Sequence, residues 1–304
     1  MNYSLQQLRV FECIARLGSV TAAAKELHLT QPAVSLQLKS LQDAFDLPLT
    51  ERIGRGLHIT PFGRDIAQVA ENILREVDEI NYRALQHNSL LAGKLSIMTV
   101  STGKYVMPYF LTAFMRAHPG VELSLDVTSR SAVLDELAHS ALDFALVSIL
   151  PDSLPVKHIT LMKNELFLVG RPDGIDPNKG GDEILRTDPL LFREQGSGTR
   201  STMEEYLGFR DIPFRKGLEL TSNEAVKQAL LAGLGFSVMP LIGIRQELEQ
   251  GLLKIIPVTD FPLTTSWRLI WRIDKKLSPV AKAYLEFVNE HKDSIINEYF
   301  KASK

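Results

Sequence analysis

Polar side chains between residues 31 and 39 are of types that hydrogen-bond to nucleic acid. The amide of Gln31 can pair with an adenine edge, the hydroxyl of Ser35 can meet a base or a phosphate, and Lys39 suits a phosphate or a guanine. These residues are spaced by four, so a helix would present them on one face. A packed helix with a solvated polar face would carry the same residue types. The pattern alone therefore leaves both interpretations open.

The residues around this polar face predict two short helices joined by a tight turn. Apolar residues recur at helical spacing over residues 20–27 and again over 34–45, so the two helices can pack through these stripes. Thr30 and Pro32 predict the start of the second helix, with Thr30 as its N-cap and the proline in its first turn. Such a pair is a standard way to place a helix in the DNA major groove.

Segments on either side of this helix pair extend the N-terminal unit. Residues 5–17 predict an amphipathic helix that ends at Gly18 and completes a three-helix core. His28 occupies the turn, where we expect a positive φ. Downstream, Arg52 and Arg55 flank Gly54 in a predicted β-hairpin wing, and both suit phosphates or a narrow minor groove. A solvated basic turn explains these charges but not their place directly after a helix pair.

The segment from Pro61 to Gly93 predicts one long helix with an apolar seam. The seam residues recur at steps of mostly three and four, with charged residues beside them: Phe62, Ile66, Val69, Ile73, Val77, Ile80 and Ala84. This spacing favours a seam between two helices of a dimer. The alternative is that the helix packs against its own chain.

From Lys94 onward the pattern changes to alternating strands and helices. A first set of strands, LSIMTV, VELSLDVT and FALVSI, and a second set, ELFLVG, LLF, GLELT and GFSVMP, alternate with helices at 105–117, 131–140, 199–208 and 223–232. The segment 266–273, which contains WRLIWRI, predicts a strand that returns toward the first set. These crossings predict a two-lobed α/β clamp, which would bind a ligand at the strand ends between its lobes.

Hydroxyl and amide side chains follow several of the expected strands and are candidate ligand groups. Beside a helix start, such hydroxyls and backbone amides can hold an anion. Capping of the next helix is the ordinary role of the same residue types. The candidates are Ser101 and Thr102, Thr128 and Ser129, Ser148, and Asn223, with Arg193 as a second possible anion partner.

The loop GSGTR is a further candidate for binding a carboxylate or a phosphate. It consists of Gly196, Ser197, Gly198, Thr199 and Arg200. The two glycines let a ligand approach the backbone closely, and two hydroxyls and a cation lie beside them at a helix start. The spacing of Ser201 and Glu204 instead predicts a capping box, as does that of Thr221 and Glu224.

The order of these motifs resembles the LysR-type transcriptional regulators. The segment TQPAVS, followed by L-x-E-R-x-G-R and then a long helix, carries the likeness, which covers nearly the whole chain. Two residues depart from the pattern. Thr50 stands where Phe is usual, which bears on wing packing, and Leu36 stands where some relatives carry Arg, which removes one base reader.

The resemblance implies the organisation and function of the chain. It implies an α/β protein with a winged helix-turn-helix domain at 1–61, a linker dimerisation helix at 62–91 and a periplasmic-binding-protein-like effector domain of two lobes at 92–304. The implied partners are double-stranded DNA, further copies in a homodimer or homotetramer, and RNA polymerase. The expected DNA-contacting residues are Thr30, Gln31, Pro32, Ser35, Leu36, Lys39, Arg52 and Arg55. The expected effector is a small carboxylate or phosphate metabolite, without a cofactor.

Composition and charge narrow the alternatives. The chain has 304 residues and a net charge of −2, and its single cysteine, Cys13, excludes an internal disulfide. It lacks the apolar run of a membrane span and the start of a signal peptide, so we expect a cytoplasmic protein. We interpret Cys13 as a packing residue, with a sensor thiol as the alternative.

Competing functions find little support in the sequence. Nucleotide-binding, zinc-protease and serine-hydrolase motifs are absent, so we expect no enzyme. A solute-binding protein without DNA function is the alternative, but it has no reason to carry the N-terminal helices. Residues 1–64 hold seven Lys and Arg against five Asp and Glu. This small excess predicts weak nonspecific DNA affinity, so several linked copies must act together.

Overall fold

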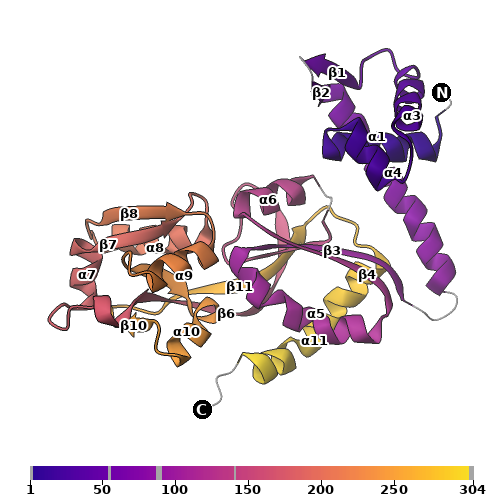
Figure 1. The fold of residues 1–304 in the computed structure, drawn as a ribbon. Coiled ribbons are helices and arrows are strands. Elements are labelled where there is room, and N and C mark those ends of the chain that lie inside the picture. The colour runs from indigo at the N-terminus through magenta and orange to yellow at the C-terminus, as the bar shows by residue number, and fades with distance from the viewer. Residues whose placement is uncertain (1–2, 54–55, 87–90, 140–141, 301–304) are drawn as a thin grey trace. The chain divides into compact units, whose positions relative to one another are not determined.

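The computed structural model describes residues 3–53, 56–86, 91–139 and 142–300, and the chain divides into two compact units, Met1–Gly93 and Lys94–Lys304 (Figure 1). Each unit has its own hydrophobic core. We describe them separately.

The first unit begins with three short helices whose ends the sequence predicts well. They are α1 (Leu5–Leu17), α2 (Val20–Glu26) and α3 (Gln31–Gln42). The α1 helix ends at Gly18 with φ +63°, and His28 has φ +53°, as expected. Thr30 caps α3, its hydroxyl accepting the Ala33 N–H at 3.4 Å. The core that joins the three helices contains Val10, Cys13, Ile14, Ala23, Ala24 and Val34.

The single cysteine is part of this core. Cys13 is buried, and burial raises the pKa of its thiol to about 11. The thiol therefore stays protonated at neutral pH and is a poor nucleophile. This supports the packing interpretation over the sensor thiol.

A hairpin connects the three helices to the long helix. Strands β1 (Thr50–Ile53) and β2 (Gly56–Ile59) pair antiparallel, and α4 (Pro61–Gln86) follows. The buried Thr60 hydroxyl donates to the Pro48 carbonyl at 2.6 Å and accepts the Gly63 N–H at 2.9 Å. A Cβ on Gly63 would lie 2.0 Å from the Leu49 carbonyl oxygen, so only glycine fits there. These contacts fix the start of α4 against the hairpin.

The apolar seam of α4 divides into two parts. Phe62 and Ile66 pack on α1 within the unit's own core, together with Ala67 and Ala70. Farther along, Val69 is 52% exposed and Ile80 is 67% exposed. The first turns therefore follow the alternative interpretation, in which the helix packs on its own chain. The later residues leave an apolar surface that the unit does not cover.

The second unit has two lobes joined by two long strands, β6 (Val156–Gly170) and β11 (Leu263–Arg272), which pair antiparallel (Figure 1). The mixed sheet that contains them has the strand order β10-β6-β11-β5-β3-β4, with β9 paired to β6. The returning strand predicted at 266–273 is therefore confirmed, since β11 pairs with β5 and β6.

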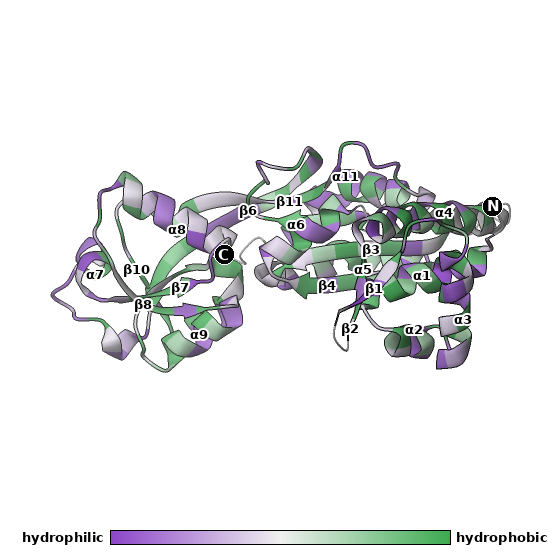
Figure 2. Cartoon of the chain, turned by 90° about the horizontal axis from the view of Figure 1, so that it is seen from above, coloured by the Kyte–Doolittle hydropathy of each residue, from purple (hydrophilic) through white to green (hydrophobic). Residues whose placement is uncertain are grey.

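The first lobe is built on β3, β4 and β5. Its elements are β3 (Ala92–Val100), the short 3₁₀ turn η1 (Ser101–Tyr105), α5 (Met107–Ala117), β4 (Gly120–Thr128), α6 (Arg130–Ala138), β5 (Phe144–Val147) and the C-terminal α11 (Pro279–Tyr299). The sequence prediction of one helix over 105–117 was wrong at its start, because Ser101–Tyr105 form a separate turn. Figure 2 shows both hydrophobic and hydrophilic residues along α11, which packs on α5.

The second lobe repeats the strand and helix alternation. Its elements are η2 (Pro172–Gly174), α7 (Gly181–Thr187), β7 (Pro189–Arg193), α8 (Gly198–Phe209), β8 (Arg215–Leu220), α9 (Asn223–Leu231), β9 (Ser237–Pro240), η3 (Leu241–Gly243), α10 (Arg245–Glu249) and β10 (Lys254–Ile256). Both capping-box predictions were wrong. Ser201 lies inside α8, where its hydroxyl donates to the Ser197 carbonyl at 3.1 Å, and Ser222 rather than Thr221 caps α9.

Candidate DNA-contacting and effector sites

The outward face of α3 carries the residues expected to contact DNA. Gln31, Ser35 and Lys39 are exposed, as are Pro32 and Leu36, while Val34 on the inner face is fully buried. Leu36 is 66% exposed, so its side chain is accessible on this face. On a helix lying in the major groove, such a side chain can contact a thymine methyl group. The face is therefore available for base contacts, and Thr30 is exposed at its N-terminal end.

The hairpin carries Arg52, one of the two cations that the sequence predicts in the wing. Arg52 is exposed on β1, where it is paired in register with Leu57 of β2. Arg55 lies outside the described residues. The described part of the wing thus presents a cation close in sequence to α3, as the sequence predicts.

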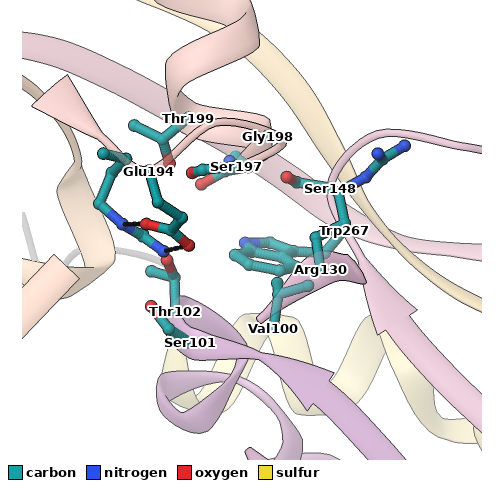
Figure 3. Close-up of a pocket in the computed structure, with 12 residues that line it drawn as sticks. Val100, Ser101, Thr102, Arg130, Ser148, Glu194, Ser197, Gly198, Thr199 and Trp267 are labelled. Atoms are coloured by element: carbon teal, nitrogen blue, oxygen red, sulfur yellow. Dashed lines mark hydrogen bonds and ion pairs between the residues drawn. The ribbon is translucent and has the colours of Figure 1, made fainter. Parts of the chain in front are cut away.

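A cavity lies between the lobes of the second unit (Figure 3). Both lobes and both connecting strands contribute to its wall. The lining residues are Val100, Ser101, Thr102, Arg130, Ser148, Asn164, Arg193, Glu194, Ser197, Gly198, Thr199 and Trp267. Seven of the predicted residues are therefore brought together: Ser101, Thr102, Ser148, Arg193, Ser197, Gly198 and Thr199.

The start of α8 forms the wall of the cavity on the second lobe. Ser197 and Thr199 are buried at 4% and 9% exposure, and the Ser197 hydroxyl makes no capping hydrogen bond. A Cβ on Gly198 would lie 2.8 Å from the Ser148 hydroxyl on the first lobe, so glycine allows this close approach. The positive end of α8 and two hydroxyls therefore face the cavity, which is an arrangement suited to an anion.

Two arginines bring positive charge to the same cavity. The Arg193 guanidinium, with 6% of its side chain exposed, donates from Nε and Nη2 to the Glu194 carboxylate at 2.7 Å each. On the first lobe, Arg130 donates from Nη2 to the Leu150 carbonyl at 3.3 Å, and its buried Nε has no hydrogen-bond partner in the described structure. An unpartnered guanidinium N–H in a cavity wall is a donor available to a ligand.

Polar contacts link the lobes beside the cavity. The Asn223 amide on α9 donates to the Ser101 hydroxyl at 3.1 Å and also contacts the Thr102 hydroxyl. Next to it, the Tyr105 hydroxyl donates to the Glu224 carboxylate at 3.2 Å. Burial raises the pKa of Tyr105, and hydrogen bonds from Gln228 and Lys227 lower that of Glu224. At neutral pH these two groups therefore stay in the states that favour this contact.

The other predicted effector residues lie outside the cavity wall. Arg200 is held by Glu204 and Glu219 at 2.7 Å each, and hydrogen bonds to these carboxylates raise its pKa. Ser129 caps α6, its hydroxyl accepting the Ala132 N–H, and Thr128 precedes it at the end of β4. The remaining two are Gly196, in the turn before α8 with φ +86°, and Asn223, which reaches the cavity only through Ser101 and Thr102.

Sequence reasoning missed several residues of the cavity wall. Arg130, Asn164, Glu194 and Trp267 line it without having been predicted. Two of them had a local signal, because Arg130 directly follows the Ser129 cap and Glu194 directly follows β7. Among the described residues, no group of His, Cys, Asp and Glu could hold a metal ion, and no helix is long and apolar enough to cross a membrane.

Comparison with known proteins adds to this geometry. Residues 5–64 match the bacterial regulatory helix-turn-helix proteins of the lysR family, and residues 88–293 match the LysR substrate binding domain. The chain is 40% identical over 295 residues to the RuBisCO operon transcriptional regulator of Allochromatium vinosum, covering 95% of this chain and 96% of that protein.

Two solved structures are also similar. The regulatory domain of CcmR from Synechocystis PCC6803, in complex with 2-PG, is 28% identical with a TM-score of 0.60, covering 69% of this chain and 98% of that chain. A full-length OxyR variant from Pseudomonas aeruginosa is 22% identical with a TM-score of 0.72, covering 97% and 95%. The second likeness shows that the fold is shared.

Proposed function

Because the chain belongs to the LysR-type family of transcriptional regulators, we propose that a small anionic metabolite binds between the lobes of its second unit and controls its action on DNA. One observation carries the proposal most directly. The cavity combines the start of α8, with Ser197 and Thr199, and the guanidinium groups of Arg193 and Arg130. These groups line the cavity from both lobes.

The chemistry of these donors favours a carboxylate or a phosphate. A guanidinium binds either group through two parallel hydrogen bonds, and the start of a helix stabilises a negative charge. The CcmR structure was solved in complex with 2-PG, and the Allochromatium relative is named for the RuBisCO operon. We therefore propose that the effector is a metabolite of this kind and that the target genes serve carbon assimilation.

On the DNA side, we propose that α3 reads bases while the wing contacts the backbone. Gln31, Ser35 and Leu36 face outward for base contacts, with Thr30, Pro32 and Lys39 beside them. Arg52 and Arg55 then supply phosphate or minor-groove contacts. The exposed seam residues of α4 join two copies into a homodimer, which can pair again into a tetramer.

The same proposal places the protein in the cytoplasm as a regulator without catalytic activity, acting with RNA polymerase at its promoters. The match of residues 5–64 to regulatory helix-turn-helix proteins favours this role over a solute-binding protein without DNA function. Binding of the effector shifts the population of lobe arrangements, and this shift changes how the subunits present α3 to DNA.

Calorimetric titration of the full chain with 2-PG and with inorganic phosphate tests the effector site. We expect saturable binding that is lost when Ser197→Ala and Thr199→Ala are combined. Ser201→Ala is the matched control, because Ser201 is exposed one turn along the same helix and lies outside the cavity wall. If neither anion binds the unaltered chain, or if the double variant binds as well as the control, the anion site is refuted.

A further inference from the structure

Trp267 stands at the boundary between the two lobes, on a strand that joins them. Its side chain is 1% exposed, and it lines both the cavity between the lobes and a second, more open pocket. The pairing of β11 with β6 shifts register between Trp267 and Arg268. Such an irregularity redirects a side chain from its regular position, so the backbone helps to hold the indole at the cavity.

The indole nitrogen of Trp267 is a buried hydrogen-bond donor that has no partner in the described structure. An indole N–H can only donate, and leaving it buried without an acceptor costs free energy. Figure 3 shows the ring projecting among the side chains of the cavity, with its nitrogen on the edge that faces Ser197. The missing acceptor would therefore have to come from the cavity itself.

We propose that Trp267 Nε1 donates a hydrogen bond to an acceptor oxygen of the bound effector and thereby helps to determine which anions bind. The inference rests on the proposed effector site. Arg130 and Arg193 attract negative charge, whereas the indole is neutral and distinguishes an acceptor from a donor. A ligand with an oxygen acceptor at this point gains a hydrogen bond. A ligand that presents an N–H group there leaves two donors facing each other.

An ordered water is the other group that could satisfy the indole nitrogen. A buried water needs two to four polar partners, and the hydroxyls of this cavity could supply them. The two occupants differ in a measurable way. If a water accepts this hydrogen bond, the indole N–H keeps the same partner when the effector binds through the other donors of the cavity. With the effector as the acceptor, removal of the N–H lowers effector affinity.

The chain offers a matched control for this test, because it contains only two tryptophans. Trp271 lies four residues farther along β11, is 8% exposed, and packs edge to face on Phe144 with ring centroids 5.7 Å apart. It is not part of either cavity wall. Replacing it with Phe removes an indole N–H from the same strand and leaves the Trp267 indole as the single one in the protein.

The experiment measures the affinity of full-length Trp267→Phe and Trp271→Phe for 2-PG and inorganic phosphate by calorimetry. We expect Trp267→Phe to lower affinity for at least one of them by about tenfold or more, the effect of losing a donor to a charged group, and Trp271→Phe to leave it unchanged. In ¹⁵N-labelled Trp271→Phe, the single indole N–H resonance should move downfield as the anion is added.

The outcomes separate the inference from the proposed function. If the unaltered chain and Trp271→Phe both bind an anion while Trp267→Phe binds it equally well and the indole resonance stays in place, the Trp267 inference is wrong and the effector site stands. If the unaltered chain binds neither probe, the proposed effector site fails and the inference fails with it. If Trp267→Phe loses affinity but the resonance does not move, Trp267 only shapes the cavity and the hydrogen bond is refuted.

Discussion

Glu194 places a carboxylate in the wall of a cavity that we propose to bind an anion. It receives two hydrogen bonds of 2.7 Å from Arg193, which is the geometry that an anionic ligand would itself adopt with this guanidinium. The carboxylate therefore competes with the ligand for Arg193 and also repels the negatively charged ligand. It also neutralises the charge of Arg193 while the cavity holds no ligand, which explains how this guanidinium can stay buried.

Replacing Glu194 with Gln should raise the affinity for 2-PG by about tenfold, because the amide is neutral and releases one of the Arg193 donors. The unliganded protein should lose about 1 to 3 kcal/mol of unfolding free energy, since Arg193 keeps a weaker partner. Calorimetry and urea unfolding measure the two effects. Glu204→Gln is the control, because Glu204 pairs with Arg200 away from the cavity. Equal or weaker binding by Glu194→Gln would show that the carboxylate supports ligand binding instead.

Gly198 limits the width of the same cavity. A methyl group there would come within 2.8 Å of the Ser148 hydroxyl, a side-chain atom that can rotate away. We therefore expect Gly198→Ala to fold normally but to bind 2-PG at least about tenfold more weakly, because the methyl group occupies the space beside the α8 N-terminus. Gly208→Ala, on the same helix with open space at its Cβ, should bind normally. Unchanged 2-PG affinity in Gly198→Ala would place the ligand elsewhere.

On the DNA side, Gln31 is the residue most open to a test of base reading. It is exposed at the first position of α3, and its amide can pair with adenine through two hydrogen bonds. We expect Gln31→Ala to reduce discrimination at one base pair of the selected sequence by about 1 to 3 kcal/mol. Competition binding against single-base variants of that DNA measures this effect. A uniform loss of affinity for all variants would assign Gln31 to the backbone.

At the scale of elements, local sequence predicted the helix ends better than it predicted what the helices contact. The Gly18 and Thr30 boundaries depend on residues a few positions apart, so they could be read directly. The α4 seam could not be assigned to one partner, because the same spacing serves packing on α1 and packing on a second copy. Ser201 was misassigned as a cap because Ser197, four residues earlier, begins the helix.

The cavity shows where prediction from sequence stops. Ser101 and Ser148 were predicted because each directly follows a strand, and the start of α8 was predicted because glycines and hydroxyls lead into a helix there. Glu194 and Trp267 were not, since what they face depends on how two lobes and a shifted strand register come together. Arg200 was chosen for its charge, but neighbouring carboxylates hold it outside the wall. Residue type and position predicted the candidate anion donors, whereas tertiary contacts decided which ones the cavity collects.

The exposed end of the α4 seam leads to a prediction about assembly. Ile80 is 67% exposed, so a polar residue there costs little stability within one chain. If this surface joins two copies, Ile80→Glu should weaken the dimer and lower affinity for DNA with two half-sites by roughly 100-fold, because the contacts are no longer linked. Analytical ultracentrifugation and DNA titration measure these effects. Gln68→Ala, on another face of α4, is the control. An undiminished dimer in Ile80→Glu would move the interface elsewhere.

For the whole molecule, charge explains why assembly should matter so much. The net charge is −2, and the first 64 residues carry seven basic and five acidic side chains. A single copy therefore gains little from nonspecific attraction to phosphates, and its affinity falls further as salt rises. Affinity for a promoter must come from correct placement of several recognition helices at once. A ligand that changes this placement can then change DNA affinity without touching DNA.

This coupling must act in both directions. If 2-PG changes affinity for a selected promoter fragment by some factor, the same fragment must change affinity for 2-PG by that factor, because both compare the same four states. We expect a factor between about 5 and 150. Calorimetry with and without DNA measures the change in 2-PG affinity, and DNA titration with and without 2-PG measures the change in DNA affinity. The combined Ser197→Ala and Thr199→Ala variant is expected to show no coupling. A factor of one in wild type would mean that the cavity's ligand does not control DNA binding, even where both ligands bind tightly.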